Sequence, residues 1–285
     1  MSAPALASHA LATSRNDIDI WLSYYGDIEG DRRLDELRKL LSPDEVIQER
    51  RFHFADDRKR YLVTRAMVRT ILSRYVPIAP GRWKFSTNGY GRPRISEEIA
   101  IRHPSARDLF FNISHTRGLI ALAIARGRDL GVDVENAAAR CVSLDVARAY
   151  FSPDEVDDLF RTPGDLQQDR FFEYWTFKES YIKARGMGLS LPLDRFSFHF
   201  PSHDAVRLRI DPDLDDHAER WSLWQYRPTP DYLLAICAER STGPQPTVSI
   251  RNFNLHAAET PPLSAAPRRR SESERGVQPT ATAVV

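Results

Sequence analysis

Apolar and polar positions alternate along some parts of this chain and repeat with helical spacing along others. Residues 18–25 alternate and predict a first strand. Further strand-like stretches lie at residues 83–86, 109–114, 119–125, 131–135, 196–200, 206–210, 221–226 and 232–238. Long helical patterns run through residues 61–75 and 175–184. Strands and helices in this mixture predict an α+β fold.

Two helix starts share the residues Ser-Pro-Asp-Glu, at positions 42–45 and 152–155. Each has Ser at the N-cap, Pro at the first helical position and Glu three residues after the cap, which is the capping-box pattern. A long helical pattern follows each copy at a similar distance, which indicates an internal duplication. We therefore expect two similar α/β halves forming a pseudo-dimer. Each half should pack a long helix on a mainly antiparallel sheet, with the active site in the cleft between them.

Composition at the two ends and the internal duplication divide the chain into four expected segments. Residues 1–16 are a flexible arm, 17–118 the N-terminal half, 119–256 the C-terminal half with the acidic site, and 257–285 a disordered tail. The tail is rich in Pro and Ser and poor in large apolar residues, so burial cannot offset its ordering entropy. The Arg triplet at 268–270 is accordingly expected to be solvated.

Bulk properties exclude several classes of function. The chain has 285 residues, with 40 Lys plus Arg against 39 Asp plus Glu, so its charge does not suit the coating of nucleic acid or a membrane surface. Its longest apolar runs, such as residues 119–125, are far shorter than the roughly 20 residues of a membrane helix. The two cysteines lack metal-ligand spacing, and the N-terminus lacks a signal-peptide pattern. We expect a reduced, cytoplasmic protein.

Acidic residues gather in two of the predicted elements. Asp133 and Glu135 are two positions apart in a strand and so share a face. Glu179 and Lys183 are one turn apart on a helix. Three converging carboxylates repel one another unless a hard cation lies between them, and oxygen ligands suit Mg²⁺ or Mn²⁺. Taken singly, the strand acids could be an ordinary polar face and the Glu179–Lys183 pair an ordinary surface ion pair. The aromatic residues around Glu179 favour a packed helix instead, where charges are paired or metal-bound.

Several residues could contact phosphate. Ser114 and His115 end a strand and offer hydroxyl and imidazole groups, although a simple turn between two strands explains this segment better when it is taken alone. Arg92 lies in a Gly-Pro turn, either exposed or able to bind phosphate through two N–H groups. Arg51 and Arg60 belong to a basic cluster that forms either a solvated helix face or an anion site.

Three motifs occur in a characteristic order along the chain. They are Phe-Asn-Ile-Ser-His at 111–115, Gly-Val-Asp-Val-Glu at 131–135 and Trp-Thr-Phe-Lys-Glu-Ser-Tyr-Ile-Lys at 175–183. In this order they resemble the 4′-phosphopantetheinyl transferases of the large, surfactin-synthetase-activating type, over about residues 17–256. The resemblance implies a monomeric pseudo-dimer. It also implies transfer of 4′-phosphopantetheine from coenzyme A to a serine of an apo acyl, peptidyl or polyketide carrier protein, with release of 3′,5′-ADP.

The resemblance also implies roles for matching residues. It places Mg²⁺ on Asp133, Glu135 and Glu179. It makes Glu179 the base that accepts the serine proton, directly or through a metal-bound water. It places Lys183 at the phosphate of the leaving group. The residues that it implies in coenzyme A binding are Arg51, Arg60, Arg92, Ser114, His115 and Lys183. The role of Lys178, within the third motif, is left open.

The chain departs from the family pattern in its first half. Where surfactin-type relatives have lysines that reach the nucleotide phosphate, this chain has Glu45 and Gln48, and Tyr61 follows Arg60 where some relatives have Thr. We expect Arg51 and Arg60 to supply the missing charge.

Two other functions remain open from the sequence. A metal-dependent phosphodiesterase or nuclease also gathers carboxylates and a lysine, but many nucleases have Lys at the position occupied here by Ala137. A non-catalytic module that binds coenzyme A or a carrier protein is the second alternative. The presence of Asp133, Glu135, Glu179 and Lys183 argues against it.

Overall fold

The structure is a computed structural model that describes residues 14, 16–139, 141–241, 245–255 and 260–271. Most of the expected N-terminal arm lies outside these residues. Helices and strands are both well represented, which confirms the expected α+β class. In the described part of the chain, no helix combines the length and apolar character needed to cross a membrane.

The first sheet has four strands in the order β11-β1-β5-β4. They span Thr247–Asn252 (β11), Asp17–Tyr24 (β1), Leu119–Arg126 (β5) and Leu109–Thr116 (β4). Strand β1 pairs antiparallel with β5 and parallel with β11. The accompanying helices are Asp31–Arg38 (α1), Pro43–Arg51 (α2), Ala55–Tyr75 (α3) and Glu97–Arg102 (α4). A small hairpin of Phe85–Thr87 (β2) and Pro93–Ile95 (β3) completes this part of the molecule.

The second sheet has six strands in the order β6-β10-β9-β12-β8-β7. They span Leu130–Asn136 (β6), Tyr232–Glu239 (β10), Trp221–Thr229 (β9), Arg269–Ser271 (β12), Ala205–Ile210 (β8) and Phe196–His199 (β7). The helices of this part are Asp145–Tyr150 (α5), Pro153–Arg161 (α6) and Gln167–Arg185 (α7).

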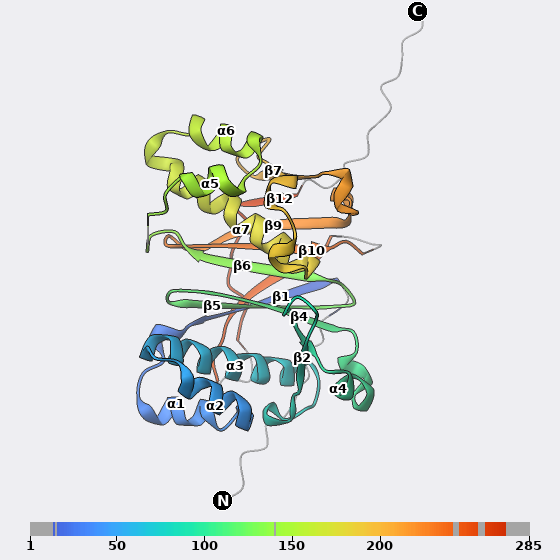
Figure 1. The fold of residues 1–285 in the computed structure, drawn as a ribbon. Coiled ribbons are helices and arrows are strands. Elements are labelled where there is room, and N and C mark those ends of the chain that lie inside the picture. The colour runs from blue at the N-terminus through green and yellow to red at the C-terminus, as the bar shows by residue number, and fades with distance from the viewer. Residues whose placement is uncertain (1–13, 15, 140, 242–244, 256–259, 272–285) are drawn as a thin grey trace, which may run out of the picture.

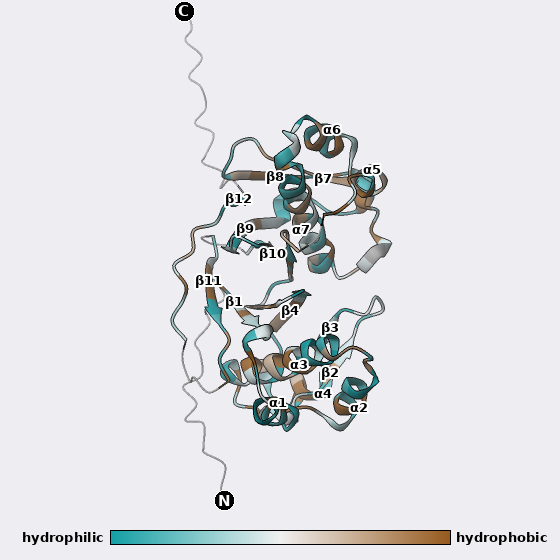
Figure 2. Ribbon diagram, turned by 90° about the vertical axis from the view of Figure 1, so that its left-hand side faces the viewer, coloured by the Kyte–Doolittle hydropathy of each residue, from teal (hydrophilic) through white to brown (hydrophobic). Residues whose placement is uncertain are grey.

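The two sheets lie between two layers of helices (Figure 1). The sheets pack face to face through apolar side chains such as Ile20 of β1 and Ile236 of β10. A second apolar cluster joins the first sheet to α3, and a third joins the second sheet to α7. Helix α1, at the outer edge, is largely hydrophilic (Figure 2). The contact between the sheets and the two contacts between sheet and helix cover both faces of each sheet. The apolar core therefore has three layers.

Both predicted capping boxes are present. The Ser42 and Ser152 side chains accept the N–H groups of Glu45 and Glu155, whose carboxylates accept the serine N–H groups in return. Each glutamate also binds the next long helix: Glu45 pairs with Arg69 of α3 at 2.8 Å, and Glu155 with Lys178 of α7 at 2.7 Å. The capping residues thus join each short helix to the long helix that follows.

The expected boundary between the halves, at residue 118/119, differs from the sheet pairing. Strand β5 forms a hairpin with β4 and belongs to the first sheet, and the chain enters the second sheet only at β6. Gly118, with φ +88°, allows the tight β4–β5 turn. Because β5 is apolar on both faces, its sequence pattern does not indicate which sheet it joins.

The expected disordered tail is also corrected. Within residues 257–285 the structure describes residues 260–271, and Arg269–Ser271 form β12 inside the second sheet. Strand β12 pairs antiparallel with β9 and parallel with β8. The prediction of a solvated Arg triplet is wrong for Arg269, which is only 4% exposed, because this residue is paired with a buried acid.

Candidate active site

The two sheets meet along a seam between strands β4 and β6. Asn112, Ser114 and Thr116 alternate along β4, so their side chains point to one face. They accept hydrogen bonds from the β6 backbone: Val132 N–H to Asn112 Oδ1 at 2.9 Å, Val134 N–H to Ser114 Oγ at 3.2 Å and Asn136 N–H to Thr116 Oγ1 at 3.3 Å. Side chains of one edge strand thereby fix the register of the other.

The same hydroxyl groups orient the two predicted strand carboxylates. Ser114 Oγ donates to Asp133 Oδ1 at 2.9 Å, and Thr116 Oγ1 donates to Glu135 Oε2 at 3.2 Å. A serine hydroxyl has one donor and two acceptor positions. In Ser114 the donor serves Asp133, and the acceptors serve Val134 N–H and the Lys183 ammonium at 3.0 Å. Ser114 is thus fully hydrogen-bonded within the site.

Helix α7 brings Glu179 and Lys183 to this seam. The Lys183 Nζ lies 2.6 Å from Asp133 Oδ1, which joins the helix to strand β6. Gly131 permits this approach, because a Cβ there would overlap the backbone of Ser180 and Ala184. The glycine two residues before Asp133 therefore decides how closely the acidic strand and the helix can pack.

The electrostatics of the site suit a cation. Burial and the negative charge of Asp133 raise the pKa of Glu179, while Lys183 partly opposes this shift. Asp133 Oδ2 is buried and has no hydrogen-bond partner among the described residues. The described residues include no group of three His, Cys, Asp or Glu side chains already arranged to hold a metal. The fit to Mg²⁺ rests instead on the unpartnered Asp133 oxygen and on hard carboxylate donors.

A pocket opens beside these residues. Its lining comes from the turn that carries Tyr90 and Arg92, from Asn112 of β4, and from Glu179 and Lys183 of α7. The pocket is therefore shared between segments of the first and second parts of the molecule, and both α7 site residues line it. A location between two parts of a molecule is usual for a small-molecule site.

Comparison with known proteins matches both parts of the chain. A model described as "4'-phosphopantetheinyl transferase, N-terminal" matches residues 31–126, and one for the 4'-phosphopantetheinyl transferase superfamily matches residues 129–237. The chain is 33% identical over 205 residues to the 4'-phosphopantetheinyl transferase Sfp of Bacillus subtilis strain 168, covering 72% of this chain and 85% of that protein. The chain belongs to the 4′-phosphopantetheinyl transferase superfamily. The transferase HetI of Nostoc sp. strain PCC 7120 is 31% identical over 75% of this chain and 84% of its own length.

Family membership confirms the predicted enzyme class: the protein is a transferase of this type. It gives no support to the phosphodiesterase or to the non-catalytic module. The two matched regions meet between residues 126 and 129, where the transferase chain passes from β5 to β6. The family match and the sheet pairing therefore agree on the division of the chain.

Two of the predicted phosphate contacts of the transferase, Arg60 and His115, interact electrostatically. Desolvation and then the positive charge of Arg60 lower the pKa of His115, which lies near the exposed end of β4. Arg60 also pairs with Asp57 at 2.7 Å, within α3. The charge of Arg60, on α3, therefore acts on His115, on β4.

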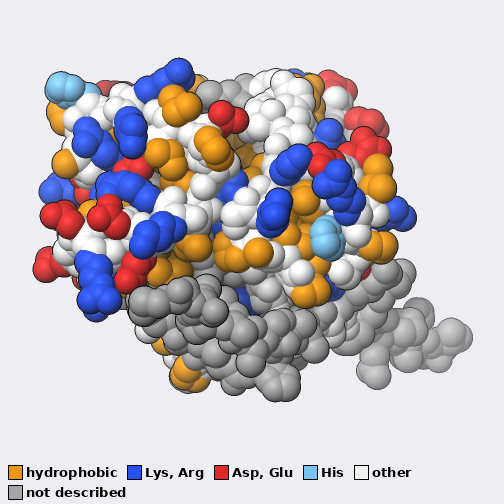
Figure 3. Space-filling view, turned by 90° about the horizontal axis from the view of Figure 1, so that it is seen from below, with side chains coloured by type: hydrophobic (Ala, Val, Ile, Leu, Met, Phe, Trp, Pro, Cys, Tyr) orange, Lys and Arg blue, Asp and Glu red, His pale blue; other side chains and the backbone are white. Residues whose placement is uncertain are grey.

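Arg51 has no hydrogen bond with Arg60 or His115 among the described residues. It is exposed at the end of α2, and its hydrogen bond is to Gln48 of the same helix, at 3.4 Å. The view from the helical side of the first sheet shows Lys and Arg side chains with acidic side chains among them (Figure 3). Glu45, at a position of family lysines, is buried and bound to Arg65 and Arg69. The predicted use of Arg51 for phosphate binding remains a prediction.

Arg92 has structural partners in the transferase. Its Nη1 donates to Asp129 Oδ1 at 3.0 Å and to Ala184 O at 2.9 Å, and its Nη2 donates to Leu130 O at 3.0 Å. Arg92 therefore links the β2–β3 hairpin to the start of β6 and to the C-terminal end of α7. Any contact with coenzyme A must use the N–H groups that remain.

Sequence reasoning did not predict the structural roles of three residues. Asn112 and Thr116 belong to the seam, and their spacing with Ser114 at every second position was a visible signal. Lys178, whose role was left open, is fully buried and donates to Leu193 O at 2.7 Å and Phe196 O at 2.8 Å as well as pairing with Glu155. Burial lowers the pKa of Lys178, against the pull of Glu155.

Proposed function

We propose that this transferase moves the 4′-phosphopantetheine arm of coenzyme A onto a serine hydroxyl of an apo acyl, peptidyl or polyketide carrier protein in a Mg²⁺-dependent reaction. The serine oxygen forms a bond to phosphorus, and the bond from that phosphorus to the leaving 3′,5′-ADP breaks. The observation that carries the proposal is the contact of Lys183 with Asp133 and Ser114, next to a pocket that Lys183 and Glu179 line together with residues of the first part of the chain.

Three carboxylates are proposed to hold the metal. Asp133 would use its buried, unpartnered Oδ2, and Glu135 and Glu179 would contribute from the neighbouring strand position and from the helix. When bound, Mg²⁺ would neutralise charge on the pyrophosphate of coenzyme A. Ser114 and Thr116 hold the Asp133 and Glu135 carboxylates in place through their hydroxyl groups. Manganese has similar preferences and could substitute.

Glu179 is proposed to accept the serine proton. Before a cation binds, burial and the negative charge of Asp133 raise the pKa of Glu179, which favours proton acceptance by its carboxylate. Lys183, one helical turn further, would hydrogen-bond the phosphate oxygen of the leaving 3′,5′-ADP. Arg60 and His115 would bind coenzyme A phosphate from the first part of the molecule.

The pseudo-dimeric architecture is part of the same proposal. Each part has a capping box whose glutamate ties a short helix to a long one, and each long helix packs on a sheet. Separate family models match the two parts. Because one chain supplies both sides of the pocket, we propose that the protein acts as a monomer.

Intact-mass measurement tests the proposed reaction. Purified protein, coenzyme A, Mg²⁺ and several apo carrier proteins should give a carrier whose mass increases by one phosphopantetheine. Asp133→Ala should abolish this gain. Glu179→Gln should lower kcat by about 10²- to 10⁴-fold, the usual contribution of a general base, with coenzyme A binding partly retained.

Glu97→Gln is the matched control, because Glu97 is an exposed acid on α4. It should leave kcat unchanged. The absence of a mass gain on every carrier would refute the proposed reaction. Near-normal turnover by Glu179→Gln would exclude Glu179 as both base and essential metal ligand.

A further inference from the structure

The C-terminal part of the chain crosses both sheets. We call residues 245–255 and 260–271 the C-terminal strap. Its first strand, β11, pairs in parallel with β1 of the first sheet, and its second, β12, lies between β9 and β8 of the second sheet. The family match ends at residue 237, before the strap begins. The strap is therefore a feature of this chain beyond the matched core of the transferase.

The strap is anchored at both ends. On the first sheet, Phe253 N–H donates to Leu22 O at 2.6 Å, and Arg251 pairs with the buried Asp19. On the second sheet, Arg268 N–H donates to Gln225 O at 2.7 Å and Arg270 N–H to Asp204 O at 3.0 Å. Strand β12 lies between β9 and β8 and pairs with both, so it joins the two sides of the second sheet.

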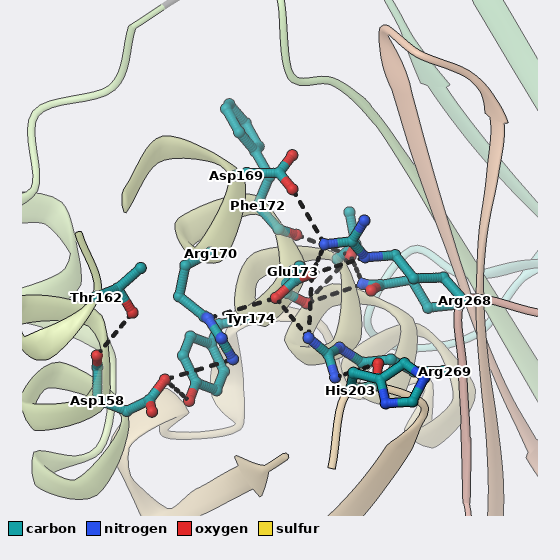
Figure 4. A network of polar contacts seen from close by, with 12 residues as sticks. Asp158, Thr162, Asp169, Arg170, Phe172, Glu173, Tyr174, His203, Arg268 and Arg269 are labelled. Carbon is teal, nitrogen blue, oxygen red and sulfur yellow. Dashed lines mark hydrogen bonds and ion pairs between the residues drawn. The ribbon is translucent and has the colours of Figure 1, made fainter. Parts of the chain in front are cut away.

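Two strap arginines converge on Glu173 of helix α7 (Figure 4). Arg268 Nε donates to Glu173 Oε1 at 2.8 Å, and Arg269 Nη2 lies 3.2 Å from Oε2. The side chains of Glu173 and Arg269 are 2% and 5% exposed, so water screens this pair little. Arg170 of α7 completes the group at 3.5 Å from Oε2. A buried carboxylate held by several cations has little freedom to move.

Further contacts tie the same part of α7 to the strap. Gln225, which is opposite Arg269 in the β9–β12 pairing, donates to Glu173 O at 3.2 Å and to Thr176 Oγ1 at 3.0 Å. Arg269 Nη1 donates to Ser202 O and His203 O, and its guanidinium lies over the Phe200 ring at 4.1 Å. Arg269 therefore bridges α7, β9 and the loop that follows β7.

We propose that Arg269, assisted by Arg268, is a positioning residue for the transfer reaction: the C-terminal strap fixes α7 so that Glu179 and Lys183 face Asp133. Glu173 precedes Glu179 by six positions on this helix, a distance of about 9 Å along the axis at 1.5 Å per residue. A shift at Glu173 would pass along a continuous helix to Glu179 and Lys183. The inference rests on the proposed roles of those two residues.

The test compares two arginines of one strand in the full-length protein. Arg269→Ala removes the buried partner of Glu173, and Arg270→Ala, on the exposed neighbour, is the matched control. Steady-state rates are measured well below the melting temperature, and hydrogen exchange of the α7 amides is measured without substrate. Arg269→Ala should lower kcat by about tenfold to a hundredfold, as misplacement of reacting groups does. The affinity for coenzyme A should fall less than kcat, because Arg60 and His115, two of the proposed phosphate contacts, lie on α3 and β4 and not on α7.

Arg269→Ala should also increase amide hydrogen exchange in α7. Arg269→Lys should have a kcat between those of Arg269→Ala and the unchanged protein. Arg270→Ala should change neither quantity. Should Arg269→Ala fail to fold, Arg268→Ala, at a residue whose side chain is 37% exposed, gives the same test with a smaller expected effect in the same direction.

A lower melting temperature with kcat and α7 exchange equal to those of Arg270→Ala would overturn the inference and leave Arg269 as a purely structural residue. That result would leave the proposed function intact, since Glu179→Gln tests the latter independently. Conversely, near-normal turnover by Glu179→Gln would refute the proposed roles of Glu179 as base and metal ligand. Hydrogen exchange of the α7 amides would still show whether the C-terminal strap holds α7.

Discussion

Breaking the buried pair of Lys178 and Glu155 should strongly destabilise the second part of the molecule. Both side chains are 0% exposed, and the Lys178 Nζ is shared between Glu155 Oε2, Leu193 O and Phe196 O, all within 2.8 Å. Lys178→Met keeps the apolar stem but removes the charge and all three donors. Glu155 keeps hydrogen bonds from Ser152 and Phe198, yet its charge is left without a cation.

Removing one partner of a buried ion pair costs about 3–5 kcal/mol, so Lys178→Met should lower the free energy of unfolding by that amount. Urea unfolding followed by circular dichroism gives the value. The double variant Lys178→Met/Glu155→Gln should recover part of it, because no unpaired charge remains. A loss below about 1 kcal/mol in the single variant would refute the argument, since it would show that Glu155 does not need the lysine charge.

Two further predictions concern the seam and its neighbourhood. Asn112→Ala leaves the Val132 N–H without its acceptor in a buried position, so it should lower the free energy of unfolding by about 1–3 kcal/mol; an unchanged urea midpoint would contradict the role of Asn112 in the seam. The pKa of His115 is lowered from 6.5, so the unfolded chain binds its proton more readily than the folded one. The resulting stability is complete above pH 6.5 and is lost as the pH falls through the lower, folded-state pKa. His115→Gln should therefore reduce the drop in melting temperature between neutral and acidic pH, and an equal drop in both proteins would contradict this prediction.

Much of the candidate site could be predicted because its residues are close together in sequence. Asp133 and Glu135 share a strand face by alternation, and Glu179 and Lys183 share a helix face by one turn. The structure adds the relation between these elements, which depends on Gly131 and on the seam. Ser114 illustrates the difference: it was expected to contact phosphate, whereas its hydroxyl is hydrogen-bonded to Asp133 and Lys183. Arg92 was likewise expected at a phosphate, and it binds backbone carbonyl groups of β6 and α7.

By itself, the sequence determined the local features: both capping boxes, the positions of most helices and strands, and the family. The capping boxes and the helix and strand positions depend on hydrogen bonds and on the spacing of apolar side chains within a few residues. Only the tertiary structure decided that β5 belongs to the first sheet, that Arg269 lies in the second, and that Glu155 holds Lys178. Each of these depends on a partner far away in the chain, and an apolar strand or a run of arginines has the same local pattern whichever partner it finds. The free energy that selects the partner comes from burial and charge pairing, which exist only after the chain has folded.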